Sequence, residues 1–123
     1  MRSILRASRR RSSALRTSPC VNSTPPWRSR GTPALLRRHG FGRRRYFDSL
    51  VCTRAGRVIG YAVYYFAYST FSCGPVLFVE DIYVLPEERG RGAGKALMIE
   101  LARIAVHEGC NQMEWLSVQL QFE

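Results

Sequence analysis

Acidic residues are absent from the first 47 positions of the chain, although thirteen of its nineteen basic residues, all arginine, lie there. The other six basic residues share residues 48–123 with all nine acidic residues, which gives that part a formal charge of −3. The net charge of +10 is therefore a property of one segment. Residues 1–34 also lack a sustained apolar period, so they cannot bury enough surface to offset the entropy lost on ordering. We expect residues 1–34 to be a disordered basic segment and residues 35–123 to form the folded domain.

Two other interpretations of the basic segment remain open. An arginine- and serine-rich N-terminus without acidic residues is typical of a mitochondrial presequence, but the apolar face around Ile4, Leu5 and Leu15 is thin. Clustered arginines attract phosphate without regard to sequence, but Trp27 is the one aromatic side chain of the segment on which a base could stack. We therefore favour a cytoplasmic protein, keep a mitochondrial location as the alternative, and rank a basic nucleic-acid-binding protein last.

Other classes of protein are disfavoured by what the rest of the sequence lacks. The longest apolar run falls well short of the ~18 residues that indicate a membrane span, so we expect neither a membrane segment nor a secretory signal. The cysteines are Cys20, Cys52, Cys73 and Cys110. They form no Cys-x-x-Cys pair and have no histidine at ligand spacing, so neither a disulfide scaffold nor a metal site is predicted. No Ser/His/Asp or Cys/His constellation is evident, and His107 is interpreted as a helix C-terminal cap rather than a base.

What the sequence does contain, from Leu50 onward, is a regular succession of strand and helix signals. Strands are predicted at residues 50–53, 58–66 and 76–85, with a tight turn at residues 54–57 between the first two. The apolar period then changes to that of a helix over residues 92–106, and Gly109 follows where a C′ glycine belongs. The buried stripe of this helix is predicted to be Leu97, Met98, Leu101, Ile104 and Ala105. A last strand begins at Glu114. This order predicts an α/β (α+β) fold with a mixed sheet, in which an antiparallel meander is followed by a helix and a parallel strand.

A glycine-rich turn lies where the third of these strands passes into the helix. Its sequence is Arg89-Gly90-Arg91-Gly92-Ala93-Gly94-Lys95. The first-turn N–H groups of a helix have no intrahelical partners, and the macrodipole favours an anion there by ~0.3–1 kcal/mol per charge. The turn is not a P-loop, because the Gly-Lys-Ser/Thr ending is absent, and not a Rossmann fingerprint, because the preceding strand belongs to a meander. An ordinary glycine-rich connection with solvated arginines is the competing interpretation.

The pattern Arg89-x-x-Gly92-x-Gly94 and the two strands before it carry a resemblance to a known family. The pattern matches Gln/Arg-x-x-Gly-x-Gly/Ala, the coenzyme A signature of the GNAT superfamily of N-acetyltransferases. Residues 60–66 (Gly-Tyr-Ala-Val-Tyr-Tyr-Phe) and 79–84 (Val-Glu-Asp-Ile-Tyr-Val) are similar to the diamine (spermidine/spermine) acetyltransferase branch. The resemblance implies that residues 35–123 are a GNAT domain, incomplete relative to the family. It also implies acetyl-CoA as cosubstrate and a homodimer as in the family.

The resemblance further assigns roles to individual residues. The backbone of Ile82, Tyr83 and Val84 would lie along the pantetheine arm, with the N–H groups of Ile82 and Val84 paired to it. The pyrophosphate would be held by Arg89, Gly90, Arg91, Gly92, Ala93, Gly94 and Lys95. Glu80 and Asp81 would face the amine. Adjacent strand residues point to opposite faces unless a bulge redirects one, and burying either carboxylate without a cation is costly. The competing interpretation is a strand end that emerges into solvent.

The chemistry implied is N-acetylation of a small polyamine-like or lysine-like primary amine. An ammonium with a pKa of ~10.4 must lose a proton before it attacks, which costs ~4.6 kcal/mol at pH 7. We expect Glu80 to be the base, directly or through water, and Asp81 to orient the cation. A backbone N–H of the same strand would polarise the thioester carbonyl. No covalent nucleophile and no metal are required.

Two departures from the family keep other functions open. Family members continue beyond the last strand into a helix whose tyrosine protonates the leaving thiolate, whereas this sequence has no tyrosine after Tyr83. The resemblance also begins only near Leu35. We therefore expect slow turnover at best. A catalytically defective coenzyme A-binding remnant remains an alternative to the enzyme, as does the nucleic-acid-binding protein.

Overall fold

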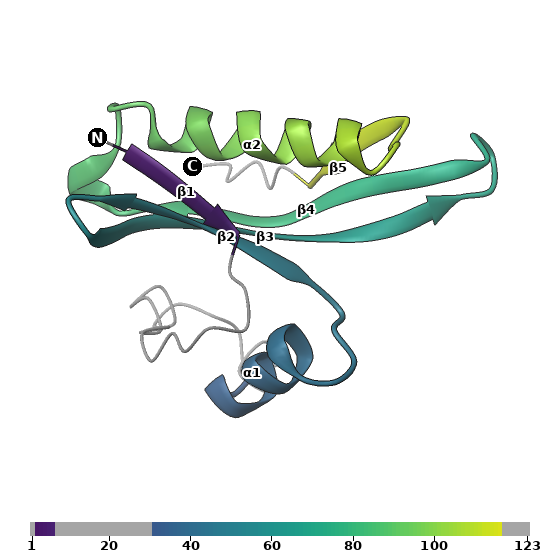
Figure 1. Cartoon of the computed structure of the whole chain (residues 1–123), viewed down its shortest axis with the longest axis horizontal. Coiled ribbons are helices and arrows are strands. Elements are labelled where there is room, and N and C mark those ends of the chain that lie inside the picture. Colours follow the sequence, from purple (N-terminus) through teal and green to yellow (C-terminus); the bar gives the residue numbers. More distant parts are fainter. Residues whose placement is uncertain (1, 7–30, 117–123) are drawn as a thin grey trace, which may run out of the picture.

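The computed structural model describes residues 2–6 and 31–116, which form one mixed sheet with helices on either side (Figure 1). Its elements are β1 (Arg2–Arg6), α1 (Pro33–Phe41), β2 (Asp48–Arg54), β3 (Arg57–Ser69), β4 (Gly74–Val84), the 3-10 helix η2 (Pro86–Glu88), α2 (Ala93–His107) and β5 (Gln112–Trp115). The sheet order of the described strands is β1-β2-β3-β4-β5. The first three pairings are antiparallel, and β5 returns parallel to β4.

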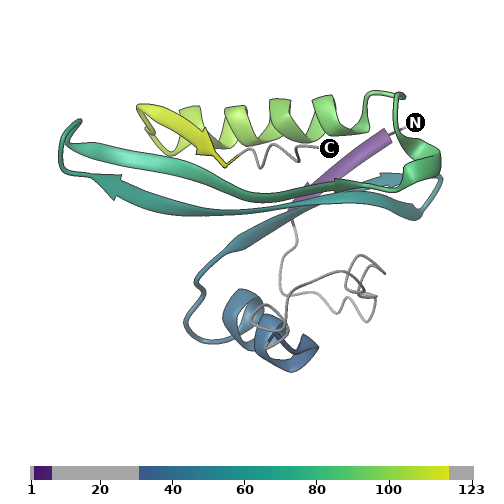
Figure 2. The same cartoon turned by 180° about the vertical axis from the view of Figure 1, so that it is seen from behind.

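The predicted α/β class and the order of meander, helix and parallel strand are confirmed. The turn between β2 and β3 is as tight as predicted, with both Ala55 (φ 49°) and Gly56 (φ 74°) in the left-handed region. The strand β3 runs three residues further than its sequence signal, to Ser69, because it stays paired with β4 as far as Gly74. Figures 1 and 2 show this hairpin extending beyond the end of α2.

The strand β1 forms where the sequence analysis placed a disordered segment. It pairs antiparallel with β2, from Arg2 opposite Arg54 to Arg6 opposite Leu50. Edge pairing needs only backbone groups and an apolar side chain directed at the core, which Ile4 supplies. The expectation of disorder is therefore wrong for these residues. It also fails at the far end of the segment, where α1 begins at Pro33. Residues 7–30 lie outside the described residues, so the division of the chain at residue 34 stays a prediction.

Helix α1 begins at a capping residue followed by a proline. The Oγ1 atom of Thr32 accepts a hydrogen bond from Leu35 N–H at 3.2 Å, and Pro33 occupies the first helical turn, where it costs no hydrogen bond. Gly40 lies so near the Phe47 ring that a Cβ atom there would be 2.7 Å from it. The missing side chain thus lets the connection to β2 fold back on the helix.

The core lies between α2 and the sheet face that it covers. Leu97, Leu101 and Ala105 are buried, and Met98 and Ile104 are half-buried against the core, so the predicted stripe is confirmed. Opposite them the sheet contributes Leu50, Ile59, Ala62, Tyr64, Leu77 and Val79. Each large side chain buried here contributes ~1.5–3 kcal/mol of hydrophobic free energy. This packing fixes both ends of α2 relative to β4.

The C-terminus of α2 is closed as predicted. Gly109 has a φ of 71° and donates its N–H to Val106 O at 3.1 Å, while Cys110 N–H donates to Ala105 O at 2.8 Å. These two bonds are a Schellman motif, which ends the helix and turns the chain toward β5. His107 lies in the last turn, where a cation suits the dipole. Among the described residues, neither helix is long and apolar enough to cross a membrane.

The free thiols differ enough in surroundings for a labelling prediction. Cys52 is buried, Cys73 is exposed, and Cys110 is half-buried. Burial, with the nearby Glu108 carboxylate second, raises the pKa of the Cys110 thiol, although a hydrogen bond with the Leu77 backbone partly opposes this. The thiolate is the nucleophile, so iodoacetamide at pH 8 should label Cys73 faster than Cys110 and leave native Cys52 unlabelled. Replacing Glu108 with glutamine should speed labelling of Cys110. Peptide mapping that finds Cys52 labelled first would contradict this packing.

Candidate functional site

The glycine-rich turn forms an open helix N-terminus. Gly90 (φ 72°) and Gly92 (φ 80°) both adopt the left-handed conformation that glycine alone takes without strain. Gly92 is the N-cap of α2, provides no capping side chain, and no acidic residue lies in the first helical turn. The first intrahelical bond runs from Ala96 N–H to Gly92 O at 3.0 Å. The three amides between them, those of residues 93–95, therefore have no intrahelical acceptor and are available to an anion.

These amides border a cavity of about 290 Å³. It is lined by Val84, Glu88, Arg89, Gly90, Gly92, Ala93, Gly94 and Lys95. Most of the residues assigned to the pyrophosphate from sequence are thus brought together here. At Gly94 an added Cβ would meet only a Val84 methyl group, at 3.9 Å, so there is open space beside the backbone at this point.

The basic side chains around this cavity are not equivalent. Arg89 is turned back on β4: its Nε–H donates to Val84 O at 3.0 Å, and its guanidinium lies 5.8 Å from the centre of the Tyr83 ring. Arg91 does not line the cavity, and its exposed side chain lies 3.8 Å from Glu88 Oε2. Lys95 lines the cavity and forms no ion pair with any described residue. Lys95 is therefore the basic side chain best placed to reach a phosphate.

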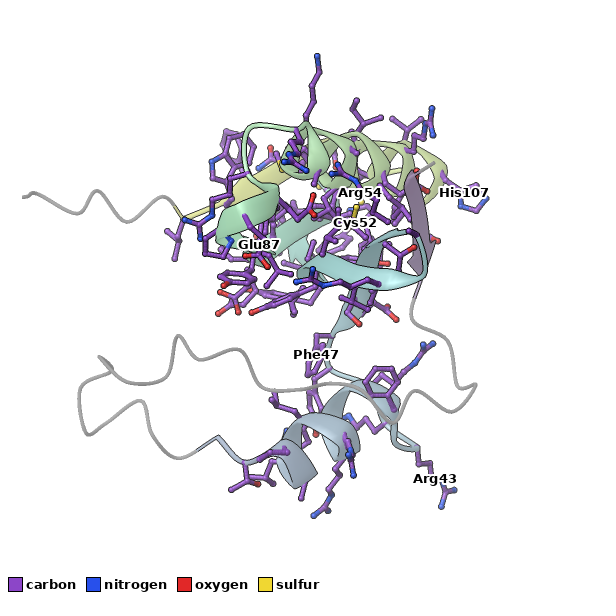
Figure 3. The ribbon with its side chains drawn as sticks, turned by 90° about the vertical axis from the view of Figure 1, so that its left-hand side faces the viewer. Arg43, Phe47, Cys52, Arg54, Glu87 and His107 are labelled. Carbon is purple, nitrogen blue, oxygen red and sulfur yellow. The ribbon has the colours of Figure 1, made fainter. Side chains whose placement is uncertain are left out.

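Glu88 is a cavity residue that the sequence analysis missed. Its carboxylate accepts a hydrogen bond from Arg54, 34 positions earlier at the end of β2, at 2.5 Å. Glu87 pairs with Arg57 at 2.7 Å in the same way. Figure 3 shows Arg54 and Glu87 in the upper part of the molecule with the sheet and α2, whereas Arg43 lies at the opposite end beside α1. The pair of glutamates directly before a basic loop was visible in the sequence, but their distant partners were not.

The strand β4 presents a free backbone edge beside this cavity. Leu85 N–H donates to Ile59 O of β3 at 2.9 Å. Because successive amides of a strand point in opposite directions, the N–H groups of Val84 and Ile82 point away from β3. On that side the pairing with β5 ends at Val79 opposite Trp115, so no described strand takes up these two amides. The N–H of Tyr83 points toward β3, and its ring lies 5.7 Å from that of Tyr61.

A β-bulge lies where β4 and β5 separate. Val63 pairs with Asp81 and Tyr64 pairs with Val79, which leaves Glu80 as the extra residue on β4. The bulge considered from sequence is present, and Glu80 and Asp81 are both exposed. The strand does not end there, because β4 stays paired with β3 as far as Val84. Neither carboxylate has a hydrogen-bond or ion-pair partner among the described residues, so both are available to a cation.

A second cavity, of about 310 Å³, opens at this bulge between β4, β5 and α2. It is lined by Val79, Glu80, Ile82, Met98, Trp115 and Leu116. Glu80 and Ile82 thus share a cavity, whereas Asp81 and Tyr83 line neither cavity. The strand from Glu80 to Val84 runs from this second cavity to the first. An anion site, an unpaired strand edge and an exposed pair of carboxylates therefore follow one another along β4.

Several acetyltransferases match this chain in sequence, and a family model matches most of it. The model of the acetyltransferase (GNAT) family matches residues 13–122. A thialysine N-epsilon-acetyltransferase of Mus musculus is 39% identical over 85 residues, which are 63% of this chain and 49% of that protein. The spermidine/spermine N(1)-acetyltransferase-like protein 1 of Homo sapiens is 36% identical over 94 residues, which are 71% of this chain and 13% of that protein. The chain therefore spans about half the length of the mouse protein.

Solved structures share the fold. An aminoglycoside acetyltransferase from an uncultured soil metagenomic sample, in complex with trehalose, superimposes with a TM-score of 0.71. The match covers 98% of this chain and 80% of that one. The identity of 14% makes this a likeness of fold alone.

Proposed function

Because the chain belongs to the acetyltransferase (GNAT) family, we propose that it transfers the acetyl group of acetyl-CoA to a primary amine of a small polyamine-like or lysine-like substrate. The observation that carries this proposal is the path from the open N-terminus of α2, along the free edge of β4, to the acidic bulge. An anion, an extended polar arm and a cation would each meet a complementary group along it.

Acetyl-CoA fits the first part of this path. Its pyrophosphate would accept hydrogen bonds from the amides of residues 93–95, with Lys95 adding charge. Its pantetheine arm, which carries amides, would extend β4 by bonding to Ile82 and Val84 in the manner of an added strand. The thioester would then lie in the second cavity, near Glu80.

The transfer itself needs one base and one source of oxyanion stabilisation. Glu80, directly or through a water molecule, removes a proton from the substrate ammonium, and the free amine attacks the thioester carbon. A β4 backbone N–H stabilises the oxyanion of the tetrahedral intermediate. Collapse of that intermediate breaks the C–S bond, while the nitrogen loses its second proton and the leaving thiolate takes one up, directly or through water, so the products are the acetamide and coenzyme A.

A cationic substrate suits the two free carboxylates. Glu80 and Asp81 are adjacent, exposed and without cationic partners among the described residues. The names of the two sequence relatives refer to thialysine and to spermidine and spermine, all of which carry primary amines. We carry that substrate class, and no single amine, over to this chain. A homodimer is proposed on the family resemblance alone, and a cytoplasmic location, with a mitochondrial one as the alternative, on the character of the basic segment alone.

An amine-dependent assay tests the proposed function. The chain is incubated with acetyl-CoA and either thialysine, lysine or spermidine, and free thiol and acetylated product are measured by absorbance and mass spectrometry. We expect thiol release above the rate without amine for at least one of the three, and no release with an alcohol of similar size. Binding of acetyl-CoA without amine-dependent release would instead support the catalytically defective remnant.

A further inference from the structure

We propose that the Arg54–Glu88 pair holds the glycine-rich turn of residues 89–95, here called the phosphate loop, in place. The pair also neutralises the Glu88 carboxylate, which lines the anion cavity. Arg54 and Glu88 are therefore positioning residues for acetyl-CoA. The inference rests on the proposed function, since it assumes that this cavity receives the pyrophosphate. It concerns two residues that the coenzyme A signature does not include.

A carboxylate at the position of Glu88 requires a cation that neutralises it. Glu88 is the last residue of η2 and lines the same cavity as the three open amides of α2. An unpaired carboxylate there would repel a pyrophosphate at short range. Arg54 reaches over from the end of β2 and hydrogen-bonds to Glu88 Oε2, so that the two charges cancel.

The Arg54–Glu88 pair is more buried than the neighbouring Arg57–Glu87 pair. The side chains of Arg54 and Glu88 are 27% and 12% exposed, whereas those of Arg57 and Glu87 are 62% and 55% exposed. Exposed ion pairs are screened by water and salt and contribute little, while a partly buried pair keeps more of its Coulomb energy. The two pairs join the same β2–β3 turn to the same 3-10 helix, so the outer pair is a matched control for the inner one.

The part of the turn before Ala93 has little packing of its own to fix its position, whereas Ala93 is buried in the core. Nothing lies within 4 Å of where a Gly90 Cβ would be, and both Gly90 and Gly92 have positive φ angles. Two side-chain hydrogen bonds anchor the start of the loop. Arg89 donates to Val84 O, and Glu88, directly before the loop, accepts from Arg54. Glu88 thus connects the β2–β3 hairpin to the phosphate loop.

The pair also determines what Arg91 can do. The Arg91 guanidinium lies 3.8 Å from the same Glu88 oxygen that Arg54 occupies at 2.5 Å. Because Arg54 already neutralises Glu88, Arg91 is only loosely held and can turn to a phosphate. Without Arg54, Glu88 would either face the phosphates with its charge uncompensated or draw Arg91 to itself, and in the second case Arg91 could no longer turn to a phosphate.

The test is a set of charge variants measured by calorimetric titration with coenzyme A. Arg54→Gln leaves Glu88 uncompensated and should weaken binding about tenfold, because the surviving charge faces the phosphates. Glu88→Gln loses the tie but leaves the Arg54 cation, which attracts phosphates rather than repelling them, so it should change binding less than about threefold. The double variant should therefore bind more tightly than Arg54→Gln alone. Arg54→Lys keeps the charge and should stay within about threefold of the parent.

Further measurements separate positioning from folding. Arg57→Gln and Glu87→Gln should each change the dissociation constant less than about twofold, since that pair is exposed. Circular dichroism and thermal unfolding establish that each variant is folded. Where turnover is measurable, Arg54→Gln should raise KM for acetyl-CoA and leave kcat unchanged. Raising the salt concentration should shrink the difference between Arg54→Gln and the parent.

The outcomes distinguish this inference from the proposed function. A parent chain that does not bind coenzyme A would overturn the proposed function and this inference with it. A parent that binds, with Arg54→Gln and Glu88→Gln equally impaired and no rescue in the double variant, would overturn the charge-cancelling role alone. Equal effects at the outer and inner pairs would do the same.

Discussion

Replacing Gly92 with glutamate should abolish measurable binding of acetyl-CoA. Gly92 has a φ of 80°, a conformation that costs a residue with a side chain ~1–2 kcal/mol. The new carboxylate would also stand at the N-cap, where it would compete with the pyrophosphate for the three open amides. Both effects act in the same direction, so we expect the dissociation constant measured by calorimetry to rise more than about a hundredfold, since ~2.7 kcal/mol corresponds to two decades.

A matched control for this variant lies at the other end of α2. Gly109 has nearly the same φ, 71°, and nothing lies within 4 Å of the position of its Cβ. Gly109→Glu should therefore lower the unfolding temperature by a comparable backbone strain but leave the affinity for acetyl-CoA close to that of the parent. If Gly92→Glu bound as tightly as Gly109→Glu, the assignment of the phosphate loop would be wrong.

Replacing Glu80 with glutamine should lower kcat by ~10²–10⁴, the usual contribution of a general base, while the affinity for acetyl-CoA stays unchanged. Glu80 is the bulge residue of β4 and lines the second cavity, whereas the amides that would hold acetyl-CoA lie further along the strand. Steady-state kinetics with a saturating amine, together with calorimetry, separates the two effects.

The neighbouring carboxylate provides a contrast. Asp81 lines neither cavity, so Asp81→Asn should act mainly on KM for the amine, as expected for a residue that attracts a cation without taking its proton. Glu100 is a distant control: it lies on α2 and pairs with Arg103, and Glu100→Gln should be neutral. A Glu80→Gln chain with parental kcat would remove Glu80 from the role of base.

The parts of this molecule that the sequence predicted are those governed by local rules. The glycine spacing of the phosphate loop, the buried stripe of α2 and the C′ position of Gly109 all follow from the preferences of neighbouring residues. The strand β1 could not be predicted in that way, because a single apolar residue, Ile4, marks it in a basic segment and its stability comes from pairing with β2. Tertiary context overrides weak local preference in such strands.

The sequence likewise predicted some parts of the candidate site and not others. Both N–H groups assigned to the pantetheine arm lie on the free edge of β4, because the alternation of a strand fixes that choice once one pairing is known. Glu88 was missed, since its role depends on Arg54, a residue 34 positions away whose approach is decided by the β2–β3 turn. The exposure of Glu80 and Asp81 depends on where β5 stops pairing, which no local signal encodes.

The central claim is that acetyl-CoA binds at the open N-terminus of α2 and along the edge of β4. The most direct measurement is an NMR titration of the isotopically labelled chain with acetyl-CoA, following the backbone amides. The largest shifts should be those of Ala93, Gly94 and Lys95, accompanied by Ile82 and Val84, because these N–H groups would gain acceptors. Shifts confined to the arginine-rich residues of α1, with the amides of residues 93–95 unchanged, would contradict it.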